Sequence, residues 1–471
     1  DLHLLSRRQR QMCIRDRELG RQEGRLCDMS RSIWENPEGP YREYHASRLC
    51  ADFLEENGFA VEIGCCGIPT AVRAVYGKGS PVIGFLGEYD ALPGQSQNDV
   101  DHKEPVEGQA FGHGCGHNLL AVSMAGSAVA AKKEMEKQGI GGTLVFYGCP
   151  AEEVLTGKGF MAREGAFSEL DCALAWHPGR YTRASYSVCT GVHSVKYHFK
   201  GRTAHAACDP EKGRSALDAV ELMNVGINYL REHVPMDVRM HYVTTNGGSA
   251  PNIVPDEATV WYYDRALNRE TMKEVEKRME KVARGAAMMT ETELTIEELG
   301  GCYPTLPNHV LGDLVDDCMR SIPQDAWTEA EIEYAGRINA TVPDIWKDSV
   351  RFSGAQDKNT HIYSGVMPID TQDDYGSTDV GDVGHIVPTT FYKTACYNIA
   401  APGHSWQVAA CVGNSIGFKG MLYGARVTAL AVLRLLTQPD IIHKAKVEFS
   451  ASMEGRSYEC MMPDYVKPPI E

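Results

Sequence analysis

The pattern of hydrophobic residues changes at Gly191 and changes back after Cys302, and this interruption limits the fold more than any other feature. Before Gly191, short apolar runs alternate with helical segments, which is typical of a mainly parallel α/β sheet. Residues 194–200 instead alternate between apolar and polar side chains, which predicts a strand with one solvated face. The expected order from there to Cys302 is β-α-β-β-α-β, the split ferredoxin-like pattern. The sequence therefore predicts a two-domain α/β chain, in which a mainly parallel α/β domain carries an inserted ferredoxin-like α+β domain.

The domain boundaries follow from where the pattern changes. Residues 29–191 and 303–471 are expected to form the α/β domain, and residues 192–302 the insertion. Within the α/β domain, residues 324–370 show no clear order of strands. Residues 1–28 are expected to be an extension outside the fold, disordered or artefactual, because their first part is rich in arginine and shows no sustained periodicity.

The composition argues against several classes of partner. The formal net charge of −16 at pH 7 disfavours nucleic acid or an anionic membrane surface, because both bind basic patches. We find no secretory signal and no apolar run of about 20 residues that predicts a membrane span. Fifteen cysteines, scattered without disulfide-like spacing, fit a reducing compartment, so we expect a cytoplasmic protein.

The stretch GHGCGHN, residues 112–118, is the strongest local candidate for chemistry. Its three glycines leave the side chains of His113, Cys115 and His117 projecting from nearly bare backbone. Residues 119–137 predict a helix, so Cys115 and His117 should lie at a helix N-terminus, where the partial positive charge favours a thiolate. A thiolate and an imidazole one residue apart can bind one zinc-like cation. A nucleophilic Cys/His pair and a tight turn are the alternatives at this point.

Further residues of metal-binding types lie in Gly- or Pro-containing loops beside predicted strands or helices. Those loops are expected on the side of the sheet where clefts form. Together they make a candidate site for two metal ions: Cys115, His117, Glu153, His177 and His404. Each residue alone is more typical of a structural histidine or a solvated loop charge, so the argument depends on all five converging.

Two adjacent carboxylates, Glu152 and Glu153, suit such a site. In a loop they can point in different directions, so that Glu153 binds metal while Glu152 faces a water molecule. Two divalent ions would lower the pKa of that water to about 7. We therefore expect Glu152 to act as general base and acid; a solvated acidic pair is the alternative.

Eight short motifs follow one another along the chain. They are GEYDALPG (87–94), GHGCGHN (112–118), PAEE (150–153), WHPG (176–179), GRTAHAA (201–207), APNIVP (250–255), GSTDVGDV (376–383) and PGHSWQ (402–407). In this order they resemble the aminoacylase/glutamate-carboxypeptidase family of two-metal amidohydrolases. Within that family the chain is most similar to the p-aminobenzoyl-glutamate hydrolase branch, over nearly its whole length.

The resemblance implies a role for each matching residue. The ligands of two divalent ions, Zn or Mn, match Cys115, His117, Glu153, His177 and His404, and the catalytic base matches Glu152. Residues 192–302 would be a lid and dimerisation domain, in which His205 reaches the neighbouring subunit's site and steadies the oxyanion. Asn252 and Arg265 match substrate-binding positions, and Arg265 suits a bidentate grip on a free carboxylate; a surface ion pair is equally open. Asp90 matches a residue that orients a metal ligand.

One position departs from much of the family. Many relatives have Asp where this chain has Asn118, although the p-aminobenzoyl-glutamate branch shares the Asn. Asn118 would place an uncharged amide beside the metals. We hypothesise that Asp379 supplies the missing charge from outside the ligand set.

The expected function is that of a metal-dependent amidohydrolase acting on a small N-acyl amino acid, with p-aminobenzoyl-glutamate or a similar fragment as the leading substrate. N-acetyl, hippuryl or auxin-type conjugates and dipeptides are alternatives within the class. A metal-free hydrolase with Cys115 as nucleophile is a second alternative. A third is a non-catalytic partner subunit, because the branch includes enzymes built from two homologous subunits. A homodimer is expected, and a hetero-oligomer with a homologous subunit is left open.

Overall fold

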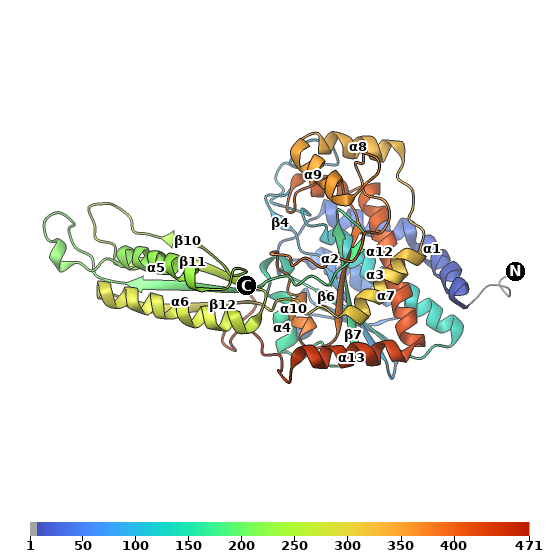
Figure 1. The fold of residues 1–471 in the computed structure, drawn as a ribbon, viewed down its shortest axis with the longest axis horizontal. Coiled ribbons are helices and arrows are strands. Elements are labelled where there is room, and N and C mark those ends of the chain that lie inside the picture. The colour runs from blue at the N-terminus through green and yellow to red at the C-terminus, as the bar shows by residue number, and fades with distance from the viewer. Residues whose placement is uncertain (1–6, 471) are drawn as a thin grey trace.

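The computed structural model describes the backbone of residues 7–470 and the side chains of residues 19–470. The chain forms a large α/β body and a smaller, elongated domain that projects from it (Figure 1). The body contains a mainly parallel sheet and the projecting domain a separate antiparallel sheet. This arrangement confirms the predicted fold class.

A seven-stranded sheet lies at the centre of the body, in the order β1-β2-β6-β3-β7-β13-β8. Its strands are β1 (Ala60–Ile63), β2 (Val72–Lys78), β3 (Val82–Glu88), β6 (Gly142–Cys149), β7 (Cys172–Gly179), β8 (Arg183–Ala184) and β13 (Thr389–Ala395). The central strands β6, β3, β7 and β13 run parallel, and the outer strands run antiparallel to their neighbours. Parallel strands bring their carboxyl ends to one edge, where clefts form in open sheets. A separate short pair, β4 (Leu92–Pro93) and β5 (Phe111–Gly112), lies in the loop that precedes GHGCGHN.

Helices cover both faces of this sheet. One face is covered mainly by α1 (Arg7–Glu35), α2 (Tyr44–Glu56), α3 (His117–Gln138), α7 (His309–Ser321), α12 (Ser415–Thr437) and α13 (Pro439–Met453). The other face is covered by α4 (Gly157–Arg163) and α10 (Val380–Gly384). Among the described residues, α12 is the one helix whose length and composition would allow it to cross a membrane. Its most apolar stretch is 83% buried inside the body, where it packs against α1 and α3, so it serves as a core helix here.

The N-terminal segment corrects one prediction. Residues 1–6 of the predicted extension 1–28 lie outside the described residues, but α1 begins at Arg7. Leu19 and Leu26 are buried in the core of the body, so the segment belongs to the fold from Leu19 onward. Helical spacing of apolar residues becomes visible only from Leu19, which is why the arginine-rich start concealed the helix.

Residues 324–370, which showed no strand order, form helices instead. They contain α8 (Glu329–Asn339) and α9 (Pro343–Ser353), which lie at one end of the body (Figure 1). α8 starts with a capping box, in which the Thr328 hydroxyl accepts from Glu331 N–H and the Glu331 carboxylate accepts from Thr328 N–H. Another body helix, α11 (Trp406–Val412), follows the loop that carries His404.

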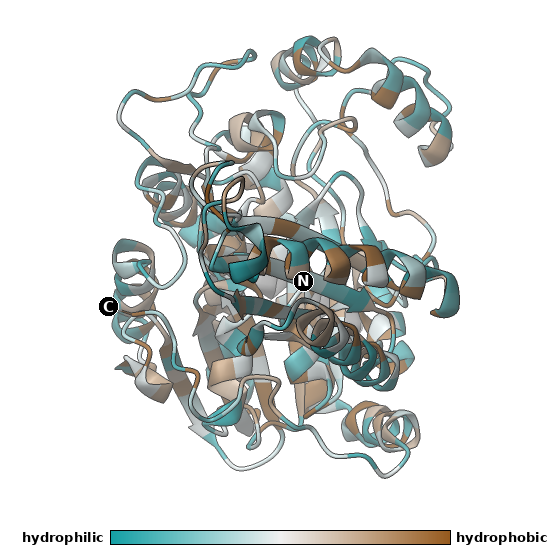
Figure 2. Ribbon diagram, turned by 90° about the vertical axis from the view of Figure 1, so that its left-hand side faces the viewer, coloured by the Kyte–Doolittle hydropathy of each residue, from teal (hydrophilic) through white to brown (hydrophobic). Residues whose placement is uncertain are grey.

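The projecting domain, which we call the lid, has its own sheet and core. Its strands are β9 (Gly191–Lys200), β10 (Arg239–Asn246), β11 (Glu257–Ala266) and β12 (Glu293–Cys302), in the order β10-β11-β9-β12. Helices α5 (Ala216–Leu230) and α6 (Arg269–Thr290) pack on one face of this sheet. Figure 2, which looks at the molecule from the lid side, shows hydrophilic and hydrophobic residues mixed along the lid elements.

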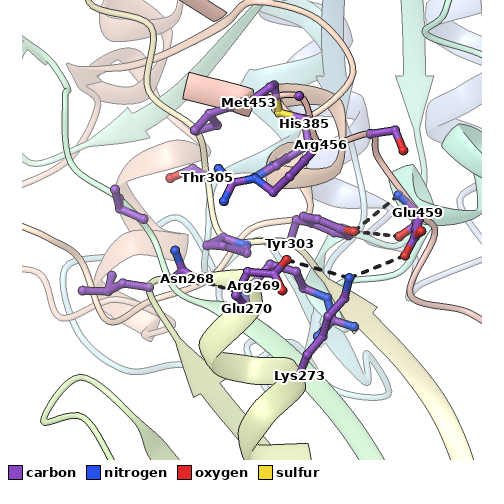
Figure 3. A pocket seen from close by; sticks show the side chains of 16 residues that line it. Asn268, Arg269, Glu270, Lys273, Tyr303, Thr305, His385, Met453, Arg456 and Glu459 are labelled. Carbon is purple, nitrogen blue, oxygen red and sulfur yellow. Dashed lines mark hydrogen bonds and ion pairs between the residues drawn. The ribbon is translucent and has the colours of Figure 1, made fainter. Parts of the chain in front are cut away.

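A pocket of about 350 Å³ lies where the lid meets the body. The Tyr303 hydroxyl donates to the Glu459 carbonyl oxygen at 2.9 Å, and Lys273 Nζ of α6 lies 3.5 Å from the Glu459 carboxylate (Figure 3). The C-terminal segment of the body is thus tied to the start of α6 and to the residue that follows β12.

Candidate metal centre

Several segments of the body meet at the carboxyl edge of the sheet. β3 ends at Glu88, β7 carries His177 near its end, and α3 begins at His117. The short turn Glu152–Val154 follows β6, and His404 lies in the loop before α11. The topology of the sheet thus gathers segments that are far apart in sequence.

The backbone at these loops is unusual. Gly116, directly before His117, has a φ of 86°, and a Cβ there would lie 3.1 Å from Pro178 Cγ, so the GHGCGHN loop needs glycine at this position. Ala151, Leu155 and His404 have φ values of 58°, 60° and 53°. Residues other than glycine seldom occupy this region, and such strain collects at functional sites.

His117 is oriented by Asp90, as the sequence suggested. His117 Nδ1 lies 2.9 Å from Asp90 Oδ1, and Asp90 Oδ2 accepts the backbone N–H of Glu153 at 2.8 Å. One buried carboxylate therefore positions two of the predicted ligand residues. His117 Nε2 is left facing the carboxylates of Glu88, Glu152 and Glu153, at 3.7, 3.9 and 3.9 Å.

The other predicted ligands lie against this group. Cys115 Sγ is 3.3 Å from His177 Nε2, and His404 Nε2 is 3.5 Å from Glu153 Oε2. The ligand atoms form two groups of three: Cys115, His117 and His177 in one, and Cys115, Glu153 and His404 in the other. Within each group the atoms lie within 4.8 Å of one another. The structure thus brings all five predicted residues together, with the Cys115 sulfur shared by both groups.

The chemistry of this cluster fits metal ions. Within the described residues, His117 Nε2 and Glu153 Oε1 are buried and have no hydrogen-bond partner, which is costly unless a ligand fills the space between them. A thiol, imidazoles and a carboxylate are donors for zinc and for manganese. A third group, formed by Glu88, His117 and Glu152, also has metal-binding spacing.

Burial disfavours the charged forms of the two glutamates and the thiol at this site. It raises the pKa of Glu152 well above the usual range, with the Glu88 carboxylate adding to the effect, and raises the pKa of Glu153 to about 7. Burial also raises the pKa of the Cys115 thiol to about 12, so it outweighs the helix N-terminus that was expected to favour a thiolate. Positive charge beside these groups would favour their ionised forms.

A cavity of about 650 Å³ opens onto the centre. Cys115, His177 and His404 line it, and the His404 side chain is the most open of these, at 58% exposed. Its remaining wall includes three cationic side chains and one side of α9: Arg180, Arg183, Lys393, Ile345, Asp348, Ser349 and Phe352. The cavity is large enough for a small organic substrate.

Sequence reasoning missed two residues here, Glu88 and Lys158. Lys158 is fully buried, and its Nζ lies 2.6 Å from Glu88 Oε1 and 2.5 Å from Asp379 Oδ1. Glu88 could have been recognised, because it lies two residues before Asp90 at the end of a strand; Lys158 carries no local signal. Among the described residues, Asp379 is linked to the centre by the ion pairs that join it to Lys158 and Lys158 to Glu88.

The amide nitrogen of Asn118 contacts two neighbouring helices. Its Nδ2 donates to Ser30 Oγ at 3.0 Å and to the Val412 carbonyl at 2.9 Å, which ties α3 to α1 and α11. Its Oδ1 is buried without a hydrogen-bond partner among the described residues, so the expectation that an uncharged amide lies beside the metals stays a prediction.

The three lid residues lie apart from the cluster. His205 and Asn252 are exposed, and neither lines the cavity. His205 Nδ1 accepts from the backbone N–H groups of Ala207 and Cys208. Arg265 is half-buried at the junction with the body, where its Nη1 donates to Ser377 Oγ at 2.7 Å.

Comparisons with known proteins find relatives that match nearly the whole chain. A family model described as a peptidase dimerisation domain matches residues 190–288. The chain is 36% identical to one of the subunits of the p-aminobenzoyl-glutamate hydrolase of Escherichia coli strain K12, over 94% of this chain and 96% of that protein. It is 26% identical to the human Xaa-Arg dipeptidase, over 92% and 91% of the two chains.

A solved structure supports the fold. The crystal structure of a Bacillus subtilis protein, described as a dinuclear metal-binding peptidase of the M20 family, superposes with a TM-score of 0.58 at 17% identity. The match covers 88% of this chain and 98% of that one. With the near full-length relationship to the Escherichia coli protein, these findings show that the chain belongs to the M20 family of peptidases and is a hydrolase of amide bonds.

Proposed function

We propose that this chain hydrolyses the amide bond between an acyl or aroyl group and an amino acid, in a reaction that depends on two divalent ions. The observation that carries the proposal is the position of Glu152. Its buried carboxylate lies 3.9 Å from His117 Nε2 but belongs to neither of the groups that share Cys115. A carboxylate that lies beside the two groups sharing Cys115, and belongs to neither, supports a role for Glu152 in proton transfer.

Each group of the site has a distinct role in this proposal. Cys115, His117, Glu153, His177 and His404 would hold the two ions, which are zinc or manganese. When bound, such ions polarise the amide carbonyl and make a neighbouring water molecule more acidic. Glu152 takes the proton from the attacking water and passes it to the leaving nitrogen.

The lid supplies the remaining contacts. Arg265 and Asn252 bind the free α-carboxylate of the substrate, and His205 of a second subunit donates a hydrogen bond to the oxyanion. Closure of the lid over the cavity would exclude water from the reaction.

The leading substrate is p-aminobenzoyl-glutamate. Support comes from the Escherichia coli relative, whose name carries that activity and whose sequence aligns with nearly the whole chain. Other N-acyl amino acids are the alternative, and so are dipeptides, which the name of the human relative favours.

We further propose that the chain forms a dimer through its lid and works in the cytoplasm. The outward face of α5 exposes Leu222, Val225 and Tyr229 by 38%, 51% and 72%, an apolar stripe that suits contact with another subunit. The partner is a second copy of this chain or a homologous subunit.

The test is an assay of the purified single chain on p-aminobenzoyl-glutamate, N-acetyl amino acids, hippurate, an auxin conjugate and dipeptides. Chelation should abolish hydrolysis, and added manganese or zinc should restore it. Hydrolysis that survives chelation but is lost on alkylation of Cys115 would contradict the proposal in favour of a cysteine nucleophile. Hydrolysis that requires a homologous subunit would identify this chain as a partner subunit.

A further inference from the structure

We propose that Lys393 and Arg180 form an anion subsite beside the metal centre, which binds the side-chain carboxylate of an N-acyl dicarboxylic amino acid such as an N-acyl-glutamate. The inference rests on the proposed function, because it gives a binding place to the side chain of the substrate, which the metal centre itself does not hold. Both residues line the cavity that opens onto Cys115, His177 and His404.

The register of the sheet puts cationic side chains next to a predicted metal ligand. Lys393 on β13 is paired with His177 on β7 and, on its other side, with Arg183 on β8. Residues paired across neighbouring strands project from the same face of a sheet, and neighbouring strands are about 4.8 Å apart. His177, Lys393 and Arg183 therefore form a row that leads away from the centre along the cavity wall.

Only part of this positive charge is neutralised by the protein. Arg183 Nη2 lies 2.6 Å from Asp370 Oδ2 and is paired. Lys393 forms only a loose ion pair, with the Asp374 carboxylate at 3.9 Å, which is beyond hydrogen-bonding distance. Arg180 has no hydrogen bond or ion pair within the described residues; its guanidinium lies 5.9 Å from the centre of the Tyr181 ring.

The acidic residues at the cavity do not cancel this charge. Asp348 on α9 pairs with Arg351 at 3.0 Å. Asp374 is 51% exposed, and its other carboxylate oxygen accepts the N–H of Gly376. In a chain with a net charge of −16, the unpaired Arg180 and the loosely paired Lys393 give the cavity local positive charge that attracts an anionic ligand.

The spacing agrees with a glutamate side chain. With the scissile carbonyl at the metal centre, the γ-carboxylate of an extended glutamate lies roughly 6 Å away, as estimated from bond lengths. One strand spacing separates the backbone of Lys393 from that of His177. The α-carboxylate is left for Arg265, which contacts Ser377 beside the cavity residue Gly376.

The sharpest test compares p-aminobenzoyl-L-glutamate with p-aminobenzoyl-L-glutamine, which differ in charge but hardly in shape. The metal-loaded wild-type chain should prefer the glutamate by about ten- to a hundredfold in kcat/KM, as expected for a charge-assisted hydrogen bond. Lys393→Met and Arg180→Gln should each lower this preference by about tenfold, mainly through KM for the glutamate substrate. Lys281→Met, on the exposed side of α6, is the matched control and should leave both rates unchanged.

Equal kcat/KM for the two substrates in the wild type would overturn the subsite, and so would variants that slow both substrates alike. Absence of turnover of either substrate would count against the proposed function. The subsite is then decided by binding: N-acetyl-L-glutamate should raise the Tm of the Glu152→Gln chain more than N-acetyl-L-glutamine does, and Lys393→Met should remove the difference. Equal shifts in Tm would contradict the inference.

Discussion

The metal centre and the lid illustrate two ways in which a site can be assembled. At the centre, the sheet of one chain brings the predicted ligands and the neighbouring carboxylates together, mostly buried. Cys115 lies 3.3 Å from His177, and the carboxylates lie 3.5–3.9 Å from the other two histidines. In the lid, His205 and Asn252 are exposed and do not line the same cavity. The ligands were predicted from their residue types as well as from the family resemblance, and they converge within one chain; the lid residues were implied by the resemblance alone, and they lie apart.

This contrast bears on which part of the proposed reaction would depend on the assembly of subunits. The centre needs only correct folding and metal, because its side chains already converge. On the proposed function, the lid residues would need a second subunit, a movement of the lid, or both, before they could touch a substrate.

The largest effect is expected at the centre itself. Glu152→Gln should lower kcat by about 10²- to 10⁴-fold, because it removes the general base while sparing the metal ligands. Turnover measurements test the loss of rate, and elemental analysis tests whether the metal ions are retained. Full activity, or loss of bound metal, would contradict the assignment.

The next effect tests whether the lid acts between subunits. His205→Ala should lower kcat by about 10²- to 10³-fold with metal content unchanged, since it removes one donor to the oxyanion. Co-refolding this variant with Glu152→Gln should recover about a quarter of wild-type activity, because half of the dimers are mixed and each has one complete site. Absence of recovery would show that His205 does not act on the neighbouring subunit.

A third prediction concerns stability and is confined to the body. Lys158→Met leaves Glu88 and Asp379 buried without their shared cation, which should lower the free energy of unfolding by about 3–5 kcal/mol. Urea unfolding of the metal-free chain measures this. Exposed Lys281→Met is the control, and an equal effect in both variants would refute the role of the buried pairs.

The smallest effect is expected for Asp379→Asn. This side chain acts on the centre only through Lys158, which keeps its second partner, Glu88, at 2.6 Å. A several-fold loss of metal affinity and rate is expected, smaller than for any ligand. If metal content and rate are both unchanged, Asp379 has only a structural role.

Local motifs and strand ends predicted much of this molecule because they reflect backbone requirements. GHGCGHN needs glycine at Gly116, where a Cβ would meet Pro178, and His177 follows the apolar core of a strand. The missed residues have no such signature. Lys158 is recognisable only once two distant carboxylates meet it, and the buried side chain of Leu26 is preceded by a charged, aperiodic start.

The most direct test of the account is a metal titration of the chelated chain and its ligand variants with zinc or manganese. Because the Cys115 sulfur belongs to both ligand groups, Cys115→Ala should weaken the binding of both ions, whereas His177→Ala and His404→Ala should each weaken one. Two ions bound by the wild type, with this pattern of losses, is the predicted result. Binding that is unchanged in Cys115→Ala, or fewer than two ions in the wild type, would contradict the claim that these side chains hold a two-metal centre.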